Sequence, residues 1–149
     1  MHVVLDNVRS AFNVGSIFRT ADAGAVEHIY LCGQLTCWPP HKKLEKTSLG
    51  AHAYVPWSRH ANTLEALKQL RARGIPIVAL ETTEQAASMH EFVWPRPVAL
   101  VFGHEVVGLE REVLLACDHQ VRIPTFGSKN SLNVATAFGI VLYDVLSRR

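Results

Sequence analysis

The chain has little excess charge, no paired cysteines and no long apolar segment. Its 15 Lys and Arg residues against 13 Asp and Glu residues give a formal net charge of only +2, so overall charge does not by itself indicate nucleic-acid binding. Its three cysteines include no CxxC pair, which argues against a disulfide scaffold and favours reduced thiols in a cytoplasmic protein. Its longest apolar runs, such as residues 98–102, are far shorter than the ~20 residues that a bilayer requires, and no signal peptide is predicted.

Common phosphate-binding and metal-binding motifs are also missing. The chain contains no GxxxxGK[ST] segment and no GxGxxG segment after a strand. The segment from Gly103 to Gly108 lacks a middle glycine, and Glu105 within it would repel a pyrophosphate. His90-Glu91 and His104-Glu105 both lack the second histidine of HExxH. A nucleotide hydrolase, an NAD-binding protein and a metal centre are therefore not predicted.

The chain does contain alternating apolar and amphipathic segments. Strands are predicted at residues 3–5, 28–33, 76–80, 97–102 and 120–123. Helices are predicted at residues 10–24, 62–73, 110–117 and 133–147, with residues 34–53 as a long connection. Apolar strands separated by helices are typical of an α/β fold with a mostly parallel sheet and helices on both faces. The length of 149 residues predicts one domain, 1–149.

Three predicted strands end in polar or glycine-containing turns. Leu80 is followed by Glu81, Phe102 by Gly103, and Ile123 by the polar segment 124–133. Ligands of open α/β sheets bind at the carboxyl ends of the strands. If these strands are neighbours, their turns form one pocket, although each turn alone can also be an ordinary one.

The predicted first helix carries polar residues at regular spacing. Asn13, Ser16 and Arg19 lie three residues apart and so drift around one side of the helix. Arg offers a rigid fork of donors that suits phosphate or hydroxyl groups. The alternative is a solvated helix face with Arg19 in a salt bridge.

Three ordered motifs give the most specific signal. They are Asn13-x-Gly15-x-x-x-Arg19-Thr20, Phe102-Gly103-x-Glu105-x-x-Gly108-Leu109 and Ile123-Pro124-x-x-Gly127-x-x-x-Ser131-Leu132-Asn133-Val134-Ala135. Over essentially the whole chain, their order and spacing resemble the signature motifs of the SpoU (TrmH-type) branch of the SPOUT RNA methyltransferases. The resemblance implies 2′-O-methylation of ribose in tRNA or rRNA with S-adenosylmethionine (AdoMet). It also implies a homodimer and a deep C-terminal trefoil knot.

The resemblance also implies roles for individual residues. It assigns AdoMet binding to Leu80, Gly103, Ile123, Ser131, Leu132 and Asn133. It assigns catalysis to Arg19, with Asn13 as its partner in the first motif and Glu105 as the carboxylate of the second. A guanidinium has no acceptor and stays protonated, so we interpret Arg19 as stabilising the developing alkoxide and gripping a phosphate rather than as a base. Glu105 is expected to organise the site by orienting Arg19 or the target nucleotide.

The residues that would hold RNA are less clearly marked. A predicted basic loop with His41, Lys42, Lys43 and Lys46 can contact phosphates or be simply solvated, and Arg9 is a second candidate. No separate substrate-binding domain is predicted, so the dimer surface is the expected RNA platform. We prefer tRNA to rRNA by analogy alone. A silent module that binds AdoMet without catalysis, and a methyltransferase for another substrate, stay open as alternatives.

Overall fold

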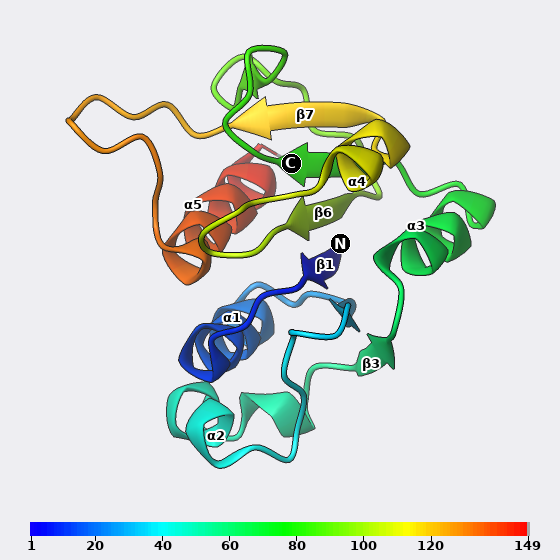
Figure 1. Cartoon of the computed structure of the whole chain (residues 1–149), viewed down its shortest axis with the longest axis vertical. Coiled ribbons are helices and arrows are strands. Elements are labelled where there is room, and N and C mark those ends of the chain that lie inside the picture. The colour runs from blue at the N-terminus through cyan, green and yellow to red at the C-terminus, as the bar shows by residue number, and fades with distance from the viewer. Residues whose placement is uncertain (149) are drawn as a thin grey trace.

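The computed structural model describes residues 1–148, which form seven strands, five α-helices and one 3-10 helix (Figure 1). Their bounds are β1 (His2–Asp6), α1 (Ala11–Ala23), β2 (His28–Cys32), α2 (Lys42–Ser48), the 3-10 helix η1 (Ala51–Ala53), β3 (Trp57–His60), α3 (Thr63–Ala72), β4 (Ile77–Leu80), β5 (Ala87–Ser88), β6 (Ala99–Phe102), α4 (Arg111–Ala116), β7 (His119–Arg122) and α5 (Val134–Ser147).

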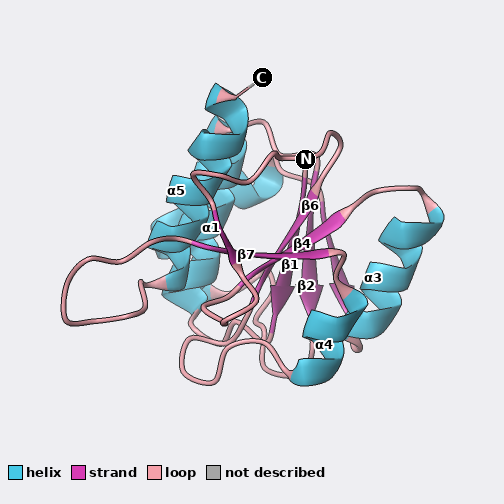
Figure 2. Ribbon diagram, turned by 90° about the horizontal axis from the view of Figure 1, so that it is seen from above, coloured by secondary structure: helices cyan, strands magenta, loops and turns pink. Residues whose placement is uncertain are grey.

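Within these residues the strands form one seven-stranded sheet in the order β3-β2-β1-β6-β4-β7-β5. Every pair is parallel. Helices α1 and α5 cover one face of the sheet, and α3 and α4 cover the other (Figure 2). Side chains alternate between these layers, so Val3 and Leu5 belong to one apolar core and Val4 to the other. The predicted α/β architecture with helices on both faces is confirmed.

Four elements differ from the sequence prediction: the strands β3 and β5, the helix α2 and the short helix η1. Strand β3 was not predicted because its Trp57-Ser58-Arg59-His60 sequence is polar, as suits a half-exposed strand at the sheet edge. The predicted basic loop is wrong, since Lys42–Ser48 form α2. This short helix packs on α1 at Gly15, where a Cβ would overlap Thr47 Oγ1 and the carbonyl oxygen of Leu44. Tertiary packing therefore stabilises a helix that is too short to be predicted from its own sequence.

The order of the last strands places one segment inside the path of another. Strand β7 lies between β4 and β5, although β5 follows β4 directly in the sequence. The chain thus leaves β4, passes to the far side of β7 and returns to β6. This path fits the knot that the family resemblance implies, and the knot itself stays a prediction.

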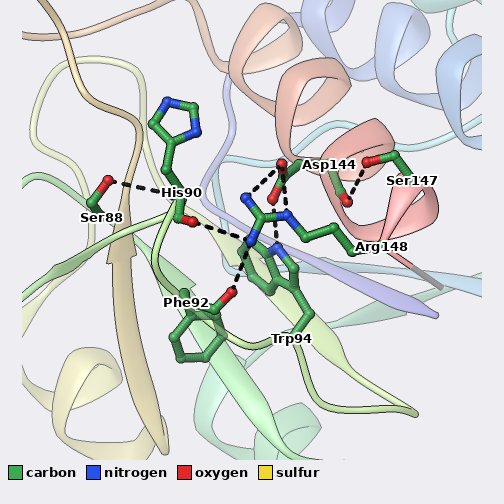
Figure 3. A network of polar contacts seen from close by, with 7 residues as sticks. All are labelled: Ser88, His90, Phe92, Trp94, Asp144, Ser147 and Arg148. Atoms are coloured by element: carbon green, nitrogen blue, oxygen red, sulfur yellow. Dashed lines mark hydrogen bonds and ion pairs between the residues drawn. The ribbon is translucent and has the colours of Figure 1, made fainter.

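A polar cluster ties the end of α5 to the segment between β5 and β6 (Figure 3). Trp94 Nε1 donates to Asp144 Oδ2 at 2.7 Å, and the Arg148 guanidinium pairs with Asp144 at 3.2 Å. Arg148 Nη1 also donates to the carbonyl oxygens of His90 and Phe92, at 3.2 and 3.4 Å. These bonds fix the far end of the helix whose first turn borders the site described below.

The cysteine thiols are poor nucleophiles near neutral pH. Burial raises the pKa of Cys32 and Cys117 to about 12, and it also raises the pKa of Cys37. All three cysteines are free. Because their pKa values are raised, their thiols are protonated and weakly reactive near neutral pH.

Among the helices of residues 1–148, none combines the length and the apolar character of a membrane span.

Histidines gather around Tyr30 at the β2–β3 edge of the sheet. His28 Nε2 and His60 Nε2 each lie 2.7 Å from Ser58 Oγ, and both rings pack on Tyr30, with centroids 4.5 and 5.4 Å away. His2, which pairs with His28 across the strands, is only 3% exposed. The single Ser58 proton can serve only one imidazole, so the other must donate to the hydroxyl oxygen. The arrangement requires at least one neutral ring.

We expect the free energy of unfolding to decrease as the pH falls below 6.5, the ordinary pKa of histidine. Burial lowers the pKa of His2, His28 and His60 in the folded chain. As the pH falls, these histidines therefore become protonated in the unfolded chain before they do so in the folded chain. The free energy of unfolding decreases between the ordinary pKa and the lower pKa values of the folded chain, and it levels off below them. Urea unfolding at about pH 8 and about pH 5.5 measures the change. A His28→Phe variant should lose less stability over this range, and an equal loss would contradict the assignment.

Candidate active site

A cavity of about 530 Å³ opens where β4, β6 and β7 end. Its lining includes five of the six residues predicted to bind the cofactor, namely Leu80, Gly103, Ile123, Ser131 and Leu132. The three strand ends converge because β4 has β6 and β7 as its two neighbours. Apolar side chains form part of its wall, and the side chains of Glu81, Thr82 and Asn130 add polar groups. Such a volume and lining suit a nucleoside-sized ligand.

The loop after β6 is held by Glu81, for which the sequence predicts no role in the site. Glu81 Oε2 accepts from the backbone N–H of Leu109 at 2.8 Å. Gly108 adopts a φ of 69°, and a Cβ there would overlap Glu81. His104 Nδ1 accepts from Val106 N at 3.0 Å. The sequence does contain a signal for Glu81, because this carboxylate directly follows a predicted strand whose turn is expected to line the pocket.

Asn133 joins the cofactor side of the site to α1. Its Oδ1 accepts from the N–H groups of Ala135 and Thr136, at 2.9 and 3.3 Å, and so caps α5. Its Nδ2 donates to Asn13 Oδ1 at 3.0 Å. Asn133 does not line the cavity. The structure thus places Asn133 where it orients the loop before α5 relative to the first motif.

Glu105 holds the beginning of α1. Its Oε1 and Oε2 accept from the N–H groups of Ser10 and Arg9, at 3.0 and 3.2 Å. Partial burial alone would raise the pKa of Glu105, but the hydrogen bonds from Ser10, Arg9 and Asn13 lower it below its ordinary value. An ionised carboxylate also interacts favourably with a helix N-terminus. Glu105 therefore connects the second motif to the first.

Arg19 lies in a different cleft from the cofactor cavity. This cleft of about 600 Å³ is lined by Ser16, Arg19, Thr20, Ala23, Lys46, Thr47 and Tyr143. It shares no lining residue with the first cavity. Within residues 1–148 no ion pair engages the exposed Arg19 guanidinium and none joins it to Glu105. The described chain thus contains neither the Arg19 salt bridge of the alternative interpretation nor an ion pair by which Glu105 would orient Arg19 directly, and orientation of the target nucleotide by Glu105 stays a prediction.

The candidate RNA-binding residues are separated by the fold. Lys46 joins Arg19 in its cleft, so two cations face one space that no acidic side chain lines. Lys42 and Lys43 are exposed in the first turn of α2, and the exposed Arg9 precedes α1.

Within residues 1–148 no group of three or more His, Cys, Asp or Glu side chains is placed to hold a metal ion.

Comparisons with known proteins identify the family of the chain. The model of the SpoU rRNA Methylase family matches residues 1–143. The tRNA (guanosine(18)-2′-O)-methyltransferase of Escherichia coli (strain K12) is 28% identical over 149 residues, which cover 99% of this chain and 63% of that protein. The chain therefore spans less than two thirds of that relative's length.

Two solved structures show the likeness in three dimensions. An AdoMet-bound rRNA methyltransferase from Sinorhizobium meliloti is 33% identical with a TM-score of 0.91, over 98% of this chain and 55% of that one. A structure described as giving insights into the 2-OH methylation of C/U34 on tRNA is 29% identical with a TM-score of 0.88, over 99% of this chain and 94% of that one. With the family model spanning almost its entire length, the chain belongs to the SpoU rRNA methylase family.

Proposed function

We propose that this chain transfers the methyl group of AdoMet to a ribose 2′-hydroxyl of RNA, with tRNA as the substrate. The observation that carries the proposal is the meeting of the three family motifs, in which Asn133 bonds to Asn13 and Glu105 bonds to the start of α1. The E. coli relative, a tRNA methyltransferase by name, and the tRNA-related structure support tRNA. The AdoMet-bound S. meliloti relative supports the cofactor and makes rRNA the second candidate substrate.

The residues of the cavity fit AdoMet. Leu80, Ile123 and Leu132 offer apolar contacts for a base, while Glu81 and Ser131 bring polar groups to the same space. When bound, AdoMet supplies a methyl group on a positively charged sulfur, so the RNA must supply the nucleophile. The chain's task is to orient the ribose oxygen and to stabilise the negative charge that develops on it as its proton leaves.

Arg19 is the residue proposed for that task. Its guanidinium is free of protein partners within residues 1–148 and lies beside Lys46, so it can approach an alkoxide and a neighbouring phosphate together. A donor aimed at developing oxyanion charge contributes ~3–4 kcal/mol to transition-state stabilisation. Asn13 and Glu105 act as positioning residues, because they set where α1 lies relative to the cofactor loops.

We propose a homodimer as the form that completes the site. On one chain the cleft of Arg19 and the cofactor cavity are separate. The outer face of α5 carries Ile140 and Tyr143, which are 38% and 51% exposed and lie one turn apart, and Tyr143 borders the Arg19 cleft. A second copy packed on this face would bury both side chains and bring Arg19 towards the partner's cavity. We expect sedimentation equilibrium to give the mass of two chains, and a monomer that retains methyl transfer would contradict this prediction.

The activity is tested by incubating the chain with methyl-labelled AdoMet and either unmodified tRNA or unmodified rRNA. Label in tRNA supports the proposed function, and label in rRNA alone assigns the second candidate substrate. AdoMet binding measured by calorimetry, without transfer to either RNA, would instead favour the silent binding module. Mutation of Arg19 provides the background control.

A further inference from the structure

An exposed tryptophan stands in the segment between β2 and α2. The Trp38 side chain is 36% exposed, and the guanidinium carbon of Arg59 lies 3.5 Å from its ring centroid. Arg59 belongs to the edge strand β3. A cation over one face of the indole fixes the plane of the ring. Trp38 therefore presents an oriented aromatic surface. Leaving this apolar surface in water costs free energy, which covering the ring with a ligand would recover.

The segment that carries Trp38 is anchored at its beginning. Leu35 N donates to Asn7 Oδ1 at 3.2 Å, and the buried Thr36 hydroxyl donates to the carbonyl oxygen of Cys32 at 2.8 Å. Gly33 has a φ of 86°, and a Cβ there would overlap the Asn7 side chain. A surface held in this way loses little conformational freedom when a ligand binds to it.

Charge differs on the two sides of this segment. Pro39-Pro40-His41 connects Trp38 to α2, whose first residues Lys42 and Lys43 are both exposed. On the other side, Leu35 borders a cleft that Glu110 and Glu112 also line. An anionic chain would thus be attracted along Trp38 and α2 and repelled from the acidic cleft. Because all strands are parallel, their carboxyl ends lie on one side of the sheet. The segment that follows β2 and the cofactor cavity are therefore on the same side.

We propose that Trp38, backed by Arg59, is a stacking platform for one unpaired RNA base near the target nucleotide, with Lys42 and Lys43 on the adjoining phosphates. The inference rests on the proposed RNA substrate and adds how that RNA is held. Proteins recognise single-stranded RNA by stacking splayed bases on aromatic rings and guanidinium groups. Cations beside the ring favour RNA over an apolar protein partner, which would leave them without counter-charges.

The test compares Trp38→Ala, Trp38→Phe and a Leu115→Ala control, which removes a side chain that is 71% exposed on α4. Binding of a fluorescein-labelled single-stranded RNA of mixed sequence is measured by anisotropy, and AdoMet binding by calorimetry. We expect Trp38→Ala to weaken RNA binding about tenfold, as loss of one stacked base does, and Trp38→Phe to stay within about threefold of the wild-type chain. AdoMet affinity should be unchanged in every variant, and Leu115→Ala should bind RNA normally.

Each other outcome has a defined meaning. RNA affinity that survives Trp38→Ala would overturn the platform and leave Trp38 as a protein-docking residue. Equal losses in Trp38→Ala and Trp38→Phe would overturn it too, because a phenyl ring can stack and a purely structural defect is then the cause. Methyl transfer by the wild-type chain is assayed separately. Binding through Trp38 without transfer therefore refutes the activity alone, and transfer without a Trp38 effect refutes the platform alone.

Discussion

Replacement of Arg19 by alanine should reduce the rate of methyl transfer by about 100-fold to 1,000-fold, as loss of a donor to a developing oxyanion does. AdoMet affinity should stay close to that of the wild-type chain, because Arg19 does not line the cofactor cavity. Stability should change little, since the side chain is exposed and no ion pair within residues 1–148 includes it. Single-turnover transfer to unmodified tRNA, with calorimetry for AdoMet, measures both effects.

Two further variants separate charge from geometry at this position. Arg19→Lys keeps the positive charge but loses the planar fork, and it should recover only part of the rate. Lys68→Ala removes an exposed cation from α3, on the other layer of the fold, and should leave the rate unchanged. Wild-type turnover by Arg19→Ala would remove Arg19 from the mechanism.

Gly103→Ala should weaken AdoMet binding by about tenfold or more, while the chain remains folded. A Cβ at this position would lie 2.7 Å from the carbonyl carbon of Gly108 and 2.8 Å from the backbone nitrogen of Leu109. These backbone atoms cannot rotate away as a side chain can, so we expect the loop, whose Leu109 N–H donates to Glu81, to shift. The cavity that this loop lines would then change shape. Calorimetry with AdoMet and thermal unfolding together measure the effect.

Gly139→Ala is the matched control for this substitution. Its added Cβ would meet only Thr20 Cγ2, at 3.8 Å, which is an ordinary contact. Within α5, alanine should even stabilise the helix by about 0.5–1 kcal/mol relative to glycine. AdoMet affinity should therefore stay at the wild-type level in Gly139→Ala. Equal affinity in Gly103→Ala and Gly139→Ala would contradict the role given to the loop after β6.

The sequence predicts the centre of the fold better than its edge. Val3-Val4-Leu5 and Ala99–Phe102 are buried on both faces, so their continuous apolar character identifies them as central strands. The edge strand β3 has no such signal, because half of it is solvated. The helix α2 is also hidden from a local reading, since it depends on the close approach of α1 at Gly15.

The candidate site divides in the same way. The turn residues after β4, β6 and β7 could be brought together from sequence because parallel strands align their carboxyl ends. The separation of Arg19 from the cavity could not be predicted, since Asn13 and Arg19 occupy one helix and only packing decides which neighbour each one faces. The contact between Trp94 and Asp144 joins residues 50 positions apart and leaves no local pattern, whereas Asp144 and Arg148 form an i,i+4 pair on one helix.

The most direct test of the account is the position of the transferred methyl group. After reaction with labelled AdoMet, the RNA is digested to nucleosides and the labelled product is identified by mass spectrometry. We expect a nucleoside whose labelled methyl group lies on the ribose 2′-oxygen, and we expect this product to be lost in Arg19→Ala. A labelled base with an unmodified ribose would contradict the account, because the site would then act on a different nucleophile.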